Sequence, residues 1–153
     1  MKYWFAALLL SVCAIAHAGA LQPLHAADIP ALLAPPARGE RLIALWALDC
    51  AYCEPNLKAL AQLQRSHPGT IELVTVATDD IDLRRAIEER LHAAGMDAWP
   101  AYAYADATPE RTNYLLDAGW GGETPRVLVI RAGGSRQGYS GELTQQQLRA
   151  IAP

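Results

Sequence analysis

The chain has 153 residues, of which 52% are hydrophobic and 19% are charged. This length suits one globular domain with a substantial core, and the composition excludes a disordered chain. The formal net charge of -3 gives no electrostatic basis for binding nucleic acid. Three cysteines are too few for a scaffold held together by disulfides.

Residues 1–18 have the pattern of a secretory signal peptide, with Lys2 at the positive start and an apolar run that follows it. Ala16–His17–Ala18 offers a cleavage site, and Ala18–Gly19–Ala20 is an alternative. The run is shorter than the roughly 20 residues that a membrane span needs. We therefore expect a periplasmic protein, exported with a cleaved signal peptide and without a lipid anchor at Cys13.

Cleavage would leave Cys50 and Cys53 as a C-x-x-C pair. An exported chain meets an oxidising compartment, where such a pair is normally joined. A bridge over so short a loop stabilises a domain little through chain entropy. Redox chemistry therefore explains the pair better than a stabilising role does.

The first half of the chain alternates between strand and helix patterns. Residues 19–40 are rich in proline and predict an irregular N-terminal arm with one short helix at 28–33. Residues 41–48 form an apolar run typical of a strand buried on both faces. The spacing of apolar residues then predicts an amphipathic helix over 51–66, ended by His67–Pro68–Gly69. The cysteine pair therefore lies where a central strand passes into a helix.

A second strand follows over residues 71–78, which are rich in β-branched side chains. Asp79, Asp80 and Asp82 indicate the start of a helix that runs to Gly95. Two such strands joined by a helix imply a parallel, right-handed βαβ unit.

The rest of the chain completes one α/β domain. Its predicted elements are a strand over 99–105, a helix over 109–118, a flexible loop over 119–123, a hairpin of strands over 125–131 and 136–140, and a helix over 144–151. We expect Tyr102, Tyr104 and Tyr114 to be core or half-buried packing residues.

The position of Cys50 at a helix N-terminus favours its thiolate, because unpaired N–H groups and the helix dipole stabilise negative charge there. A thiolate attacks disulfides, and Cys53, one turn further on, can resolve the mixed disulfide. Structural zinc would need two more ligands, and His25, His67 and His92 have no paired spacing. A plain structural disulfide is the other alternative.

Two motifs carry a resemblance to a known family. Trp46 to Cys53, WALDCAYC, resembles the W-A-x-x-C-x-x-C signature of the thioredoxin superfamily. Residues 122–141, with Pro125 and their spaced glycines, are similar to the ending of its exported TlpA/ResA-like branch, and residues 99–106 also fit that branch. The resemblance implies a thioredoxin-like three-layer fold over residues 41–153, with a mixed central sheet and helices on both faces.

The resemblance also implies roles for single residues. In this family the proline that matches Pro125 is cis and faces the cysteines, and the residue before it presents its backbone to a bound partner chain. Trp46 would shield the pair, although it also suits an ordinary core. We therefore expect Cys50 and Cys53 to be catalytic, Trp46, Ala51, Tyr52, Thr124 and Pro125 to contact the substrate, and no residue to bind metal.

The sequence departs from the family at two places that manage the proton of the resolving cysteine. Ala44 stands where cytoplasmic thioredoxins bury an acid, and Asn56 stands where the exported branch commonly has glutamate. Asp49 and Glu54 are the acids left near the pair to replace them.

These features together predict a periplasmic thiol-disulfide oxidoreductase that reduces disulfides in partner proteins. We expect a monomer that needs no cofactor beyond the Cys50–Cys53 disulfide and exchanges electrons with a membrane-bound thiol reductant or oxidant. One alternative is an oxidising or isomerising enzyme. Another is a copper-binding assembly factor, although that branch uses C-x-x-x-C and a late histidine, and His92 is the last one here. A third is an inert binding module with a buried first sulfur.

Overall fold

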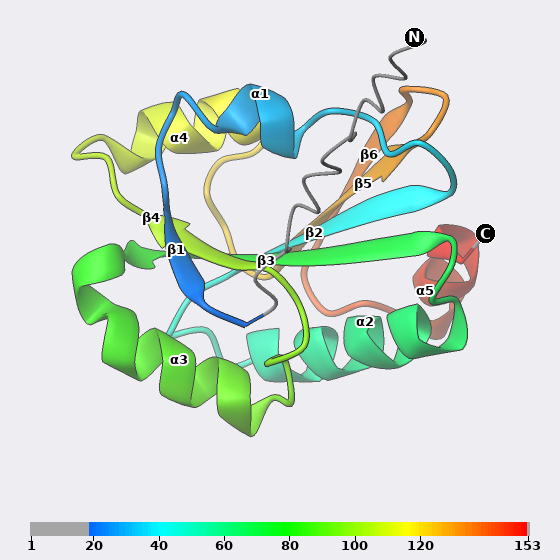
Figure 1. Cartoon of the computed structure of the whole chain (residues 1–153), viewed down its shortest axis with the longest axis horizontal. Coiled ribbons are helices and arrows are strands. Elements are labelled where there is room, and N and C mark those ends of the chain that lie inside the picture. Colours follow the sequence, from blue (N-terminus) through cyan, green and yellow to red (C-terminus); the bar gives the residue numbers. More distant parts are fainter. Residues whose placement is uncertain (1–18, 153) are drawn as a thin grey trace, which may run out of the picture.

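The computed structural model describes residues 19–152, so the predicted signal peptide lies outside the described residues. A six-stranded sheet runs through the centre of the molecule, between two layers of helices (Figure 1). The strands are β1 (Leu21–Leu24), β2 (Glu40–Trp46), β3 (Ile71–Asp80), β4 (Ala101–Tyr104), β5 (Arg126–Arg131) and β6 (Arg136–Ser140). The helices are α1 (Ile29–Leu32), α2 (Cys53–Ser66), the 3-10 helix η1 (Ile81–Leu83), α3 (Arg84–Ala93), α4 (Pro109–Leu116) and α5 (Gln145–Ile151).

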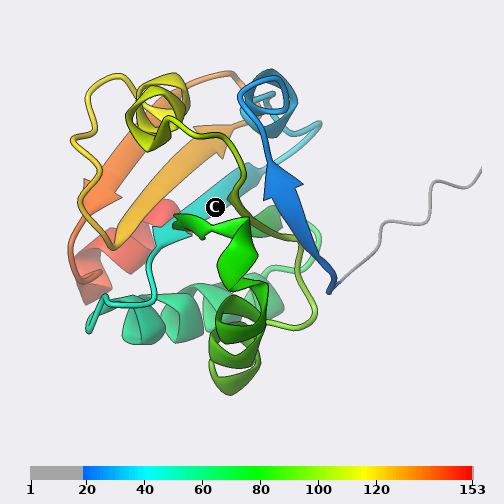
Figure 2. The ribbon, with the colours of Figure 1, turned by 90° about the vertical axis from the view of Figure 1, so that its left-hand side faces the viewer.

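The sheet is mixed, with the strand order β1-β4-β3-β2-β5-β6. The strands β1, β4, β3 and β2 pair in parallel, and β5 and β6 form an antiparallel hairpin beside β2. Helices α1 and α4 cover one face, while α2, α3 and α5 cover the other (Figures 1 and 2). This arrangement confirms the predicted three-layer fold and the parallel β2-α2-β3 unit.

The continuous apolar run of β2 is explained by its place between two cores. Leu42, Ala44 and Trp46 lie in the core on the α2 side, together with the cysteine pair. Ile43 and Leu45 lie in the core on the α1 and α4 side. Because neighbouring strand residues point to opposite faces, a central strand of this kind needs apolar residues at every position.

The N-terminal arm is more regular than predicted, because residues 21–24 form the edge strand β1. Leu21 and Leu24 are buried, and they anchor this strand beside β4. Pro23 faces outward on the edge, where a missing N–H costs little. The prediction of an irregular segment was wrong here, since the prolines obscured a strand that only its pairing with β4 could reveal.

The helix predicted to start at Asp79 begins later. Strand β3 continues to Asp80, and α3 starts only at Arg84, after η1. The carboxylate of Asp80 accepts a hydrogen bond from the Asp82 N–H at 2.8 Å and caps η1. The prediction treated Asp79 and Asp80 as parts of one cap, whereas their side chains have different partners.

We expect Gly39→Ala to lower the free energy of unfolding by about 3 kcal/mol or more. Gly39 has a φ of +64°, and an added Cβ would lie 1.9 Å from the carbonyl oxygen of Thr70, which also accepts the Glu40 N–H. Gly69 is the matched control, because a Cβ there meets nothing within 4 Å. Urea denaturation of both variants provides the measurement, and equal midpoints would contradict the argument.

Candidate active site

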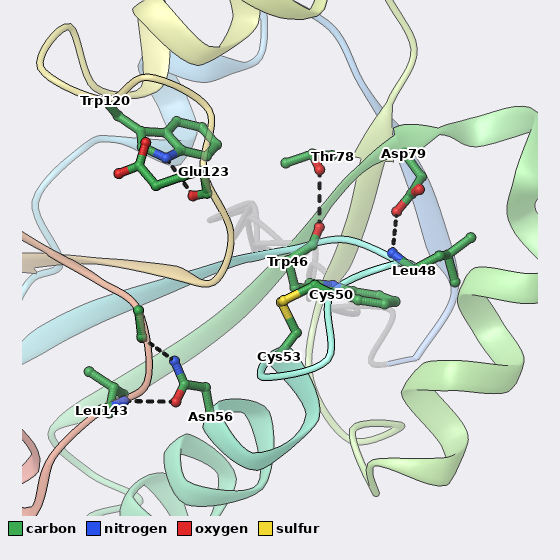
Figure 3. Close-up of a disulfide and its surroundings, with 11 residues drawn as sticks. Trp46, Leu48, Cys50, Cys53, Asn56, Thr78, Asp79, Trp120, Glu123 and Leu143 are labelled. Atoms are coloured by element: carbon green, nitrogen blue, oxygen red, sulfur yellow. Dashed lines mark hydrogen bonds between the residues drawn. A yellow bond between two sulfur atoms is a disulfide. The ribbon is translucent and has the colours of Figure 1, made fainter.

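Cys50 and Cys53 are joined by a disulfide in the turn between β2 and α2 (Figure 3). Helix α2 begins at Cys53, two residues later than predicted, so Cys50 precedes the helix in a turn in which its N–H donates to the Ala47 carbonyl at 3.3 Å. Cys50 is 9% exposed and Cys53 is 1% exposed. The first cysteine is therefore the more accessible of the two, although both are largely covered in the disulfide form.

The surroundings of the disulfide differ sharply in exposure. Ala51 and Tyr52, the two residues between the cysteines, are exposed, and Tyr52 keeps 62% of its surface exposed. Trp46 is only 1% exposed and packs in the same core as the cysteines (Figure 3). Within residues 19–152 the indole N–H of Trp46 has no hydrogen-bond partner. Ala51 and Tyr52 thus have the surface to meet a partner chain, while Trp46 supports the pair from the core.

Two side chains at the end of β3 bind the backbone just before and just after the end of β2 (Figure 3). The hydroxyl of Thr78 donates to the carbonyl oxygen of Trp46 at 3.3 Å. The carboxylate of Asp79 accepts the N–H of Leu48 at 2.9 Å. Side chains therefore continue the link between β2 and β3 after the backbone pairing has ended at Trp46 and Ala77.

Asn56 connects the cysteine helix to the opposite side of the site (Figure 3). It is 4% exposed, its amide oxygen accepts the Leu143 N–H at 2.9 Å, and its amide nitrogen donates to the Gly141 carbonyl at 2.9 Å. The Gly141 N–H donates in turn to the carbonyl of Pro125, also at 2.9 Å. In the sequence, Asn56 stood out only because the exported branch commonly has glutamate at this position. In the structure its amide both donates and accepts a hydrogen bond, and an ionised carboxylate could not do both because it has no donor.

The peptide bond between Thr124 and Pro125 is cis. Pro125 is buried and Thr124 is half-buried. The loop before them was predicted to be flexible, but Trp120 is only 5% exposed and packs in the core on the α1 and α4 side. Its indole N–H donates to the carbonyl of Glu123 at 2.7 Å (Figure 3). A large buried side chain among glycines was the signal that could have identified this anchored loop.

Arg126 also holds this loop, through hydrogen bonds and ion pairs. Its guanidinium binds the carboxylate of Asp117 and donates to the Ser140 hydroxyl at 2.7 Å, and that hydroxyl donates to Glu123 at 2.7 Å. Burial would raise the pKa of Asp117, but the hydrogen bonds from Arg126 and Gly119 and the Arg126 charge outweigh it and lower the pKa. The hydrogen bond from Ser140 lowers the pKa of Glu123. Both carboxylates are therefore held in the ionised form that pairs with Arg126.

The acids proposed to replace the missing proton acceptor have other surroundings. Glu54 is bound by Lys58 at 2.6 Å, and this hydrogen bond with the Lys58 charge lowers the pKa of Glu54. A lowered pKa makes Glu54 a weaker proton acceptor. Asp49 is exposed, and Ala44 is buried in the α2-side core.

The three tyrosines expected to pack in the core separate into different environments. Tyr104 is 2% exposed and donates to the Asn113 side chain at 2.6 Å, and burial raises its pKa. Tyr102 is half-buried. Tyr114 is 65% exposed, so the prediction was wrong for this residue, which lies on the outer side of the short helix α4.

The described residues contain no cluster of three or more His, Cys, Asp and Glu side chains that could hold a metal ion. They also contain no helix that is long and apolar enough to cross a membrane.

No family model matches the sequence, and no curated protein matches it. Among solved structures, a secreted disulfide oxidoreductase of Mycobacterium tuberculosis, homologous to E. coli DsbE, gives a TM-score of 0.59 at 15% identity over 76% of this chain and 82% of that chain. The thioredoxin-related protein of Neisseria meningitidis serogroup B gives 0.59 at 23% identity over 75% and 83%. A thiol:disulfide interchange protein of Chlorobium tepidum gives 0.58 at 20% identity over 80% and 81%. The chain therefore has the thioredoxin-like fold that its motifs predicted and that these proteins share.

Proposed function

We propose that this protein is a periplasmic thiol-disulfide oxidoreductase that reduces disulfides in partner proteins. The observation that carries the proposal is the Cys50–Cys53 disulfide, which lies at the junction of β2 and α2 with the more exposed cysteine, Cys50, before the helix. Solved proteins of this fold include disulfide oxidoreductases and an interchange protein. The predicted signal peptide supports export, and one of the similar structures belongs to a secreted protein.

The reaction starts from the reduced pair. The Cys50 thiolate attacks one sulfur of a partner disulfide, forming a mixed disulfide and releasing the other partner sulfur as a thiolate, which takes up a proton. Cys53 loses its proton and attacks the Cys50 sulfur, so the Cys50–Cys53 disulfide forms and the second partner thiol leaves. The partner gains two electrons and two protons. The cysteine pair supplies both electrons and the Cys53 proton, and the second proton comes from the solvent, which took up the Cys50 proton when the thiolate formed. A membrane-bound dithiol protein would reduce the pair again.

The docking edge that we propose for this exchange is the backbone of Thr124, the residue before Pro125. In the proposed complex an extended partner segment pairs with the backbone of the half-buried Thr124, while Pro125, which has no N–H, contributes no donor. The loop is held by Trp120 and Arg126, so the edge is ordered before a partner arrives. An ordered edge lowers the entropic cost of binding.

The test is the reduction potential of the Cys50–Cys53 couple together with the reduction of insulin by the wild-type protein. We expect a potential near the thioredoxin value of about -270 mV, and insulin reduction when a dithiol supplies electrons. A potential near about -120 mV would instead show an oxidant, which is the alternative that the same site allows. A protein that catalyses no exchange in either direction would contradict both.

A further inference from the structure

Asp79 stands apart from the other acids near the cysteine pair. Residues 47–52 form the turn that contains Cys50 and leads to Cys53. Within the described part of the chain this turn makes one hydrogen bond to a side chain, in which the Leu48 N–H donates to the Asp79 carboxylate at 2.9 Å. Asp79 is half-buried at the end of β3, beside the turn (Figure 3). The neighbouring Asp80 is exposed and caps η1 instead. The two aspartates thus have separate functions.

The bond to Leu48 fixes the turn where backbone pairing no longer can. Strand pairing between β2 and β3 ends at Trp46, and Leu48 lies halfway between that point and Cys50. The Cys50 N–H donates to Ala47, so the cysteine is part of the same tight turn. Holding Leu48 therefore limits the positions that the Cys50 sulfur can occupy.

The carboxylate also places a negative charge beside the turn. Two other acids are close to the cysteines in sequence, and of these Glu54 is paired with Lys58 and Asp49 is exposed. In the loop before Pro125, Glu123 is paired with Arg126 and Ser140. A partly shielded carboxylate disfavours a nearby thiolate, whereas the α2 N-terminus favours it. Destabilising the thiolate disfavours the dithiol form and makes a couple more reducing.

We propose that Asp79 is a positioning residue that holds the Cys50 turn and biases the pair toward acting as a reductant. The proposal rests on the proposed function and specifies its direction. It also assigns a role to this acid in the last turn-facing part of β3, separate from the cap of η1 that Asp80 forms.

Three variants separate the two effects. Asp79→Asn keeps an acceptor for the Leu48 N–H and removes the charge, while Asp79→Ala removes both. Asp82→Asn is the matched control, because it removes one exposed charge from η1 and leaves the hydrogen bond between Leu48 and Asp79 in place. The Cys50 thiolate is titrated by its ultraviolet absorbance, and the dithiol-disulfide equilibrium with glutathione is measured for each reduced protein.

We expect Asp79→Asn to lower the Cys50 pKa by about half a unit, and to shift the glutathione equilibrium about threefold toward the dithiol form. Asp79→Ala should show the same shifts and, in addition, an insulin turnover about tenfold below that of Asp79→Asn, because the turn is no longer held. Asp82→Asn should match the wild type in all three measurements.

If Asp79→Asn matches Asp82→Asn in both pKa and equilibrium, the electrostatic part is overturned. If Asp79→Ala matches Asp79→Asn in turnover, the positioning part is overturned. The thiol titration and the glutathione equilibrium need no protein substrate, so they test Asp79 even if the wild type fails to reduce insulin. That failure would overturn the proposed function alone.

Discussion

Cys50→Ser should abolish the reduction of insulin disulfides, leaving only the rate at which the dithiol electron donor reduces insulin by itself. In the proposed reaction the attacking thiolate belongs to Cys50, because Cys50 is 9% exposed whereas Cys53, the first residue of α2, is 1% exposed. A serine hydroxyl cannot attack a disulfide at neutral pH, since its pKa lies far above that of a thiol. The measurement is insulin turbidity with dithiothreitol as the electron donor.

Cys53→Ser should give a different defect. Cys50 can still attack, but nothing resolves the mixed disulfide, so covalent adducts with partner chains should accumulate. Non-reducing electrophoresis and mass spectrometry detect these adducts, which should disappear on treatment with excess thiol. Cys50→Ser is the control and should form none. Adducts in Cys50→Ser but not in Cys53→Ser would reverse the two roles.

Loss of the disulfide should not unfold either variant. The bridge closes a very short loop, so its effect on the unfolded chain is small. The reduced wild type is the proper reference for the free energy of unfolding. A variant that matches the reduced wild type in stability and lacks exchange has lost chemistry rather than structure.

Strong local patterns predicted most of the fold. The apolar run of β2 and the spacing of α2 located the cysteine pair at a strand-helix junction, which the structure confirms. Each of these patterns lies within a few neighbouring residues, because an apolar face, a turn or a helix cap depends on residues that are close together in the sequence.

What the sequence could not predict depends on partners that lie far apart along the chain. Strand β1 needs β4 beside it, and Asn56 needs the backbone of Gly141 and Leu143. Asp79 resembled a helix cap until its distance to Leu48 was known. A polar residue has several possible uses, and only the folded chain selects among them.

Asn56→Ala should lower the free energy of unfolding by about 2 to 4 kcal/mol and also slow catalysis. The substitution leaves the Leu143 N–H and the Gly141 carbonyl without the partners they have now, and an unpaired buried group costs about 1 to 3 kcal/mol. It also cuts the link from α2 through Gly141 to Pro125, so the cysteines and the docking edge are no longer held together. Urea denaturation and insulin turnover give the two measurements.

The matched control is Gln62→Ala, an exposed amide on the same helix, which should change stability by less than about 0.5 kcal/mol.

A more discriminating variant is Asn56→Asp, which keeps the acceptor for Leu143 but turns a carboxylate toward the Gly141 carbonyl. Repulsion and burial raise the folded-state pKa of that carboxyl above its unfolded value. The loss in free energy of unfolding that the ionised carboxylate causes is therefore complete above the folded-state pKa. It declines as the pH falls through that pKa, because the protonated group can donate to the Gly141 carbonyl. The stability difference from wild type should narrow between pH 7 and about pH 4. A difference that is constant over this range would show that Asn56 does not donate to Gly141, and the proposed link between the cysteine helix and Pro125 would be lost.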